Sequence, residues 1–109
     1  MRPIRARVVG ATLLAVLAIG CGGGQGAPKS QDPQVRAQEL IESGNSAYRA
    51  GQYAVAAKRY AAAAVEKKDD PAAYYGMGMA LTKLGRDEEA RRAYAKAREL
   101  AQTRAAEGR

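Results

Sequence analysis

The chain has 109 residues, of which 47% are hydrophobic and 27% are charged, a balance that fits one small folded domain and not a disordered chain. It contains no histidine and one cysteine, which excludes an internal disulfide and the usual histidine or multiple-thiolate metal sites. The sequence also offers no nucleophile–base pair and no phosphate-binding loop. We therefore expect a protein that is not an enzyme and that needs no cofactor.

Residues 1–20 have the pattern of a secretory signal peptide. Three arginines and no acidic residue precede residue 8, and residues 8–20 are uncharged and mostly apolar. As a helix this apolar run reaches roughly 20 Å, short of the roughly 30 Å hydrocarbon core of a membrane, which disfavours the alternative of a true transmembrane helix. Without the three arginines the formal net charge falls from +7 to +4. Nucleic acid is not an expected partner of an exported chain with this mild charge.

The end of this segment, Leu17–Cys21, resembles the lipobox of bacterial lipoproteins. The small residue Gly20 stands before the cysteine, whereas Ala18 occupies a position that is more often leucine in the family. The resemblance implies cleavage before Cys21 and a covalent lipid on its thiol, and therefore a membrane anchor at the bacterial cell envelope. Resemblance to enterobacterial lipoproteins would associate an aspartate after the cysteine with inner-membrane retention. Gly22 stands there instead, so an outer-membrane address facing the periplasm is preferred. The alternative is a secreted protein with a free thiol.

Residues 21–31 are expected to form the lipidated cysteine and a flexible tether. The stretch after the cysteine, GGGQGAPKSQ, has no hydrophobic periodicity and is rich in Gly, Ser, Gln and Pro. Such a linker holds the following domain roughly 16–19 Å from the anchor. The folded part of the protein is therefore expected to work close to a membrane surface.

Residues 32–70 and 71–104 repeat one pattern at an offset of 34. The recurring pairs are Gly44 and Gly78, Gly51 and Gly85, Ala56 and Ala90, Tyr60 and Tyr94, and Ala63 and Ala97. A period of 34 is the length of the tetratricopeptide repeat, and these small, glycine and aromatic positions resemble its pattern. The resemblance implies an all-α fold of two helix–turn–helix repeats, in which four antiparallel helices form a short right-handed solenoid. Residues 105–109 are expected to be a C-terminal tail.

Local signals place these four helices near residues 33–49, 53–67, 71–84 and 87–104. An Asp-Pro pair starts the first and the third, because aspartate caps a helix and proline suits its first turn. Gly51 and Gly85 supply the tight turn between the helices of each hairpin.

Glycines and tyrosines indicate how these helices pack. Gly44 and Gly78 lie in mid-helix, where glycine costs about 1 kcal/mol, so they predict close helix contacts. Tyr60 and Tyr94 are expected to fill the core between successive helices. The last helix carries eight charged residues between 87 and 99, which predicts a polar outer face that caps the array.

The tetratricopeptide resemblance also implies a concave groove, lined by the first helix of each hairpin, in which peptides or proteins bind. The groove-facing candidates are Ile41, Asn45, Tyr48, Arg49, Tyr75, Met79, Thr82 and Lys83. Arg49 and Lys83 are 34 residues apart, so they should form a basic column suited to an acidic partner. The alternative is that both are solvated cations favoured by a helix C-terminus.

Together these features predict a non-catalytic, membrane-anchored interaction module or scaffold at the cell envelope, with a protein or peptide partner. The alternative is a self-associating structural subunit of an envelope machine, such as a pilus, secretion or outer-membrane assembly apparatus. Two repeats bury a modest core, and a homodimer could supply the missing neighbour.

Overall fold

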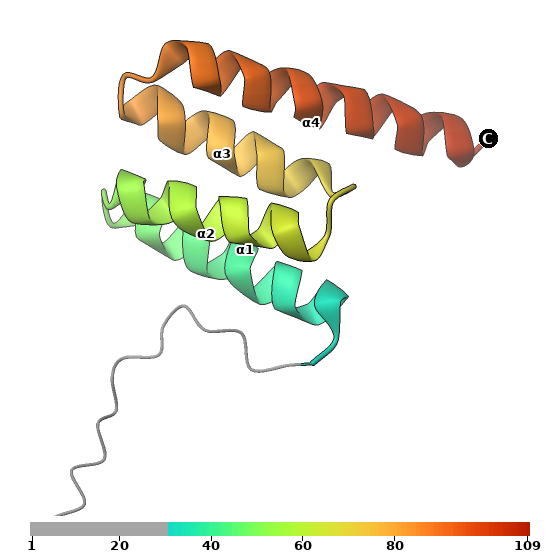
Figure 1. The fold of residues 1–109 in the computed structure, drawn as a ribbon, viewed down its shortest axis with the longest axis horizontal. Helices are drawn as coiled ribbons and strands as arrows, with labels where there is room; N and C mark the ends of the chain where they lie inside the picture. The colour runs from blue at the N-terminus through green and yellow to red at the C-terminus, as the bar shows by residue number, and fades with distance from the viewer. Residues whose placement is uncertain (1–30) are drawn as a thin grey trace, which may run out of the picture.

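The computed structural model describes residues 31–109. The predicted signal peptide, the lipidation of Cys21 and residues 22–30 of the predicted tether lie outside the described residues. Four helices make up the described fold: α1 (Pro33–Arg49), α2 (Tyr53–Glu66), α3 (Pro71–Lys83) and α4 (Asp87–Glu107). They form two antiparallel hairpins, α1 with α2 and α3 with α4, and α3 packs against the first hairpin (Figure 1). The predicted all-α architecture is confirmed.

Both hairpins begin at a capped helix. The carboxylate of Asp32 accepts a hydrogen bond of 2.9 Å from the backbone N–H of Gln34, and that of Asp70 accepts one of 3.0 Å from Ala72. Each bond satisfies an N–H group that has no partner within the helix. A proline follows in the first turn of both helices, as the Asp-Pro pairs predicted.

The turn inside each hairpin depends on a glycine. Gly51 has φ of +77° and Gly85 has φ of +75°, a left-handed conformation that favours glycine. After α1, the N–H of Gln52 donates to the carbonyl of Ala47 at 2.9 Å, and that of Gly51 donates to Tyr48 at 3.0 Å. This pair of bonds is the Schellman motif, which closes the last turn of a helix and reverses the chain. The equivalent bonds follow α3.

Helix ends differ from the predicted ones by up to three residues. Helix α2 stops one residue early, because Lys67 has extended backbone, and α3 also stops one residue early. Helix α4 continues past residue 104 to Glu107, since no glycine or proline interrupts it before Gly108. The side chain of Arg104 also donates to the carbonyl of Asp69 at 3.3 Å. None of the helices within residues 31–109 has the combination of length and apolar character that crossing a membrane requires.

Small side chains dominate the core. Among the described residues, ten of the fourteen buried hydrophobic side chains are alanines, and the other four are Leu40, Ile41, Tyr60 and Leu81. Alanine lets neighbouring helices approach closely, so the single large buried ring needs space made for it elsewhere.

Two glycines provide that space. The ring of Tyr60, on α2, is only 1% exposed. A Cβ atom on Gly44 of α1 would lie 2.9 Å from this ring, and one on Gly76 of α3 would lie 2.4 Å from it. Tyr60 therefore fills the junction between the two hairpins, as expected. Gly44 makes room for a tyrosine of the facing helix, and Gly76 does so from the next hairpin.

Candidate functional site

One residue predicted to face the groove, Ile41, is buried instead. Ile41 is 7% exposed and belongs to a buried cluster that includes Ala73 and Ala80 of α3. It is therefore a core residue and not a groove residue, because the second hairpin covers it. Tyr75 occupies the position 34 residues later, where the described chain supplies no further helix, and it is 54% exposed.

Asn45 is occupied by an internal contact. Its side-chain oxygen accepts a hydrogen bond of 2.5 Å from the hydroxyl of Tyr60. Burial raises the pKa of Tyr60, nearby Tyr48 raises it further, and Arg49 lowers it. Asn45 therefore has a structural role as the partner of this buried ring's hydroxyl.

An aromatic and cationic cluster connects the two hairpins. The rings of Tyr48 and Tyr53 are in edge-to-face contact, with centroids 5.2 Å apart. The ammonium nitrogen of Lys83 lies 5.9 Å from the centroid of the Tyr53 ring, within the range of a cation–π interaction. We call these three residues the tyrosine–lysine cluster. Tyr53 was not among the predicted groove residues. Its position at the start of α2, directly after the turn at Gly51, was the signal that could have identified it.

The remaining predicted groove residues lie near the ends of α1 and α3. Arg49 is exposed, and its guanidinium donates to the hydroxyl of Ser46 at 3.4 Å. Thr82 is exposed, and its hydroxyl donates to the carbonyl of Gly78 at 2.8 Å within the same helix. Met79 is half-buried. That Arg49 and Lys83 form one basic column stays a prediction.

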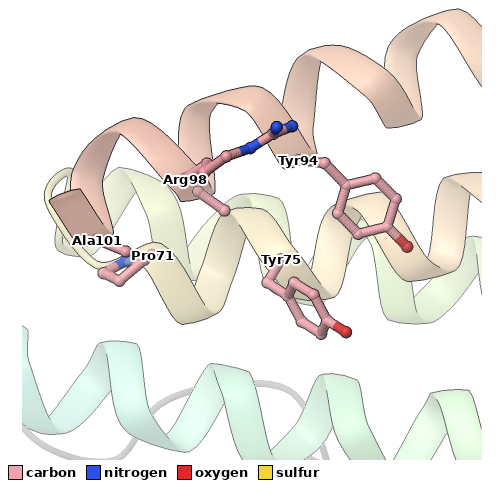
Figure 2. Close-up of a pocket in the computed structure, with 6 residues that line it drawn as sticks. Pro71, Tyr75, Tyr94, Arg98 and Ala101 are labelled. Carbon is pink, nitrogen blue, oxygen red and sulfur yellow. The ribbon is translucent and has the colours of Figure 1, made fainter.

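A second surface lies at the C-terminal end of the array. It is a hollow of about 560 Å³ lined by Pro71, Tyr75, Tyr94, Ala97, Arg98 and Ala101, which we call the C-terminal end face (Figure 2). The rings of Tyr75 and Tyr94 meet edge to face, with centroids 5.5 Å apart. Tyr94 is half-buried and lines this open hollow, whereas it was expected to be a core residue.

Apart from Arg98, the charged residues of α4 lie outside this hollow. Glu88 pairs with Arg92 at 3.8 Å, and Lys96 pairs with Glu99 at 3.2 Å, and none of these four residues lines the hollow. Arg98 is the one charged residue among those that line it. The expected polar face of α4 therefore does not extend over this hollow, whose lining is apolar and aromatic except for Arg98.

Within residues 31–109, no group of three or more His, Cys, Asp or Glu side chains is placed to hold a metal ion. The two surfaces offer aromatic rings and cationic groups, and these are suited to contacts with another polypeptide.

The sequence also matches a known family over its second hairpin. The family model described as tetratricopeptide repeat matches residues 71–104, which contain α3 and most of α4. No curated protein and no solved structure matches the chain. The 34-residue offset relates the first hairpin to this matched unit. The chain thus contains a tetratricopeptide repeat at residues 71–104, within an all-α helical-repeat fold of tetratricopeptide type.

Proposed function

We propose that this protein is a non-catalytic interaction module that a lipid on Cys21 anchors at the bacterial cell envelope. Tetratricopeptide repeats generally mediate contacts between proteins, which gives the general class of function. The observation that supports a specific surface is the tyrosine–lysine cluster, which spans both hairpins. A segment bound there would contact the two repeats at once.

The chemistry of this surface suits an acidic segment. Lys83 and Arg49 are exposed cations, and Tyr48 and Tyr53 add apolar contact area beside them. Tyrosine and arginine are enriched among the residues that contribute most to binding energy. We therefore propose a partner segment with carboxylate side chains, bound along the ends of α1 and α3.

The proposed location rests on the sequence. A basic start, a short apolar run and a small residue before the single cysteine support lipidation of Cys21. Gly22 supports the outer membrane, facing the periplasm. Acyl chains contribute about 0.8 kcal/mol for each buried methylene, so a lipoprotein with several chains would remain attached.

Charge reversal tests the binding surface. A partner is first isolated from detergent-solubilised envelopes with the tagged lipoprotein, and its affinity is then measured at two salt concentrations. The double variant Arg49→Glu and Lys83→Glu should weaken binding by more than about tenfold, or 1.4 kcal/mol, and leave the helical circular dichroism unchanged. The matched control is Arg91→Glu with Arg92→Glu, two exposed cations of α4. A larger loss in the control would assign binding to α4 instead.

Mass spectrometry tests the anchor. The mature wild-type protein should carry a diacylglyceryl group on an N-terminal Cys21, and Cys21→Ser should leave unprocessed precursor or a protein released from the membrane. An unmodified Cys21 in the membrane-bound mature protein would contradict the proposal.

A further inference from the structure

The C-terminal end face is formed by the same repeat positions as a surface that is buried inside the molecule. Its six residues correspond, 34 positions earlier, to Ala37, Ile41, Tyr60, Ala63, Ala64 and Lys67. The first five of these are buried, each at most 8% exposed. The fold thus contains this surface twice, covered in the first hairpin and open in the second.

The covered copy shows what kind of element fits. Helix α3 packs on it with the buried small residues Ala73, Gly76 and Ala80. Gly76 lies over the Tyr60 ring, where a Cβ atom would come within 2.4 Å. A helix can therefore pack on this surface when a glycine lies above the tyrosine ring.

The open copy has the corresponding ring and one new charge. By the 34-residue offset, Tyr94 takes the place of Tyr60 and Tyr75 takes the place of Ile41. Tyr75 is 54% exposed and its ring lies against that of Tyr94 (Figure 2). Arg98 replaces the buried Ala64 and has no ion-pair partner among residues 31–109. An occupant of this face would meet two tyrosine rings and a cation.

We propose that the C-terminal end face is a docking site for an amphipathic helix of a partner protein. That helix carries glycine over the ring of Tyr94 and a carboxylate side chain beside Arg98. A helix bound at this site would pack on the second hairpin as α3 packs on the first. It is distinct from the tyrosine–lysine cluster, so this proposal does not depend on the proposed function.

A second copy of this chain fits the site poorly. In a continuous stack, its α1 would take the place of a third-repeat helix. The residues of α1 that correspond to Ala73, Gly76 and Ala80 are Glu39, Glu42 and Ser46. Glu42 would place a long charged side chain where the ring requires a glycine. We therefore propose a helix from a different protein, and not α1 of a second copy, as the occupant.

A designed helix tests the site without knowledge of the natural partner. The probe is a stapled, fluorescent peptide of about 18 residues, long enough for stable helix when constrained. It carries Ala, Gly and Ala at the spacing of Ala73, Gly76 and Ala80, one Glu placed to reach Arg98, and alternating Lys and Glu elsewhere. Fluorescence anisotropy with the full chain in mild detergent should show saturable binding. A peptide with leucine in place of its glycine should bind at least tenfold more weakly.

Variants of the chain locate the contact. Tyr75→Ala should weaken binding at least tenfold, whereas Val65→Ala, which shortens a 73% exposed side chain of α2, should leave it unchanged. Arg98→Glu should weaken binding of the peptide that carries Glu. The same variant should bind well a peptide in which Lys replaces that Glu. Thermal melts confirm that each variant is folded.

Three results would overturn the proposal. These are absence of binding, equal binding of the glycine and leucine peptides, and binding that Tyr75→Ala leaves intact. Light scattering adds a fourth: a dimer of the wild-type chain that Tyr75→Ala converts to a monomer would assign the face to a second copy.

Discussion

The two hairpins carry the same tyrosine at the same position, yet the two rings have different surroundings. Tyr60 lies between two glycines from two other helices and is almost completely buried. Tyr94 packs against one glycine, Gly78, and its other side faces the open hollow at the end of the array. The environment of a repeat residue is therefore set by the unit that follows it as much as by its own helix.

The hydroxyl groups of Tyr60 and Tyr94 also have different neighbours. The hydroxyl of Tyr60 donates to Asn45, but the residue that corresponds to Asn45 in the second hairpin is Met79. A thioether is a weak acceptor, so the second hairpin lacks the polar contact that fixes the first ring. Substitutions that remove the ring, add a methyl group beside it or remove its hydroxyl test the contrast between Tyr60 and Tyr94.

Removal of each ring should have the largest effect. Replacing a buried aromatic side chain with alanine typically costs about 3–5 kcal/mol, because the transfer energy is lost and a cavity remains. We expect Tyr60→Ala to lose about that much and Tyr94→Ala to lose less than half as much. Urea denaturation of the two variants measures the difference. Equal losses would mean that Tyr94 is as well packed as Tyr60.

Addition of one methyl group should have an intermediate effect. Gly76→Ala gains about 1 kcal/mol of helix propensity but forces a Cβ atom against a ring that is held from both sides, for a net loss of about 1–2 kcal/mol. Gly78→Ala makes a similar contact with Tyr94, at 2.6 Å, but this ring can move toward the open face. Its net change should stay within about 0.5 kcal/mol.

Larger substitutions at the same glycines sharpen this test. The mid-helix position of Gly78 predicts that Gly78→Leu is strongly destabilising, by about 1–3 kcal/mol. Gly76→Leu should be more damaging still, since Tyr60 has no open side. Thermal melts followed by circular dichroism give the order, and a Gly78→Leu variant as stable as wild type would contradict the packing of the second hairpin.

Removal of one hydroxyl should have the smallest effect. Tyr60→Phe loses the hydrogen bond to Asn45 and should cost about 1 kcal/mol, whereas Tyr94→Phe should be neutral. The pKa of Tyr60 is raised in the folded state, mainly by burial. The unfolded chain therefore ionises this group first, near its ordinary pKa of about 10.

The sign of the pH dependence follows from that shift. The stability that neutral Tyr60 provides is complete below pH about 10 and is lost as the pH rises through the higher folded-state pKa. Wild type should consequently lose more stability than Tyr60→Phe between pH 9 and 11. Parallel stability curves for the two proteins over this range would contradict the assignment.

Sequence patterns predicted the fold better than they predicted the role of each side chain. The capping aspartates and the two turn glycines act through neighbouring backbone, so they gave the helix starts and turns correctly. Gly76 was missed because the 34-residue comparison pairs it with Glu42 and hides its contact with Tyr60. Helix α4 extends beyond its predicted end because nothing in its local sequence interrupts it.

The candidate site was harder to predict for a related reason. Ile41 and Tyr75 hold the same repeat position, but only the first has a helix packed over it. The single-repeat pattern therefore assigned both to the groove, although one is core and the other lies on the end face. The roles differ because α3 covers Ile41, whereas no helix among the described residues covers Tyr75.

The alanine-rich core also determines how the fold responds to temperature. The heat-capacity change on unfolding grows with the apolar area that becomes exposed, and alanine exposes little of it. A small heat-capacity change gives a broad, shallow dependence of the unfolding free energy on temperature. The domain should therefore keep nearly constant stability over a wide range around its optimum, and scanning calorimetry should find a heat-capacity change per residue below the usual 12–15 cal/mol/K or so.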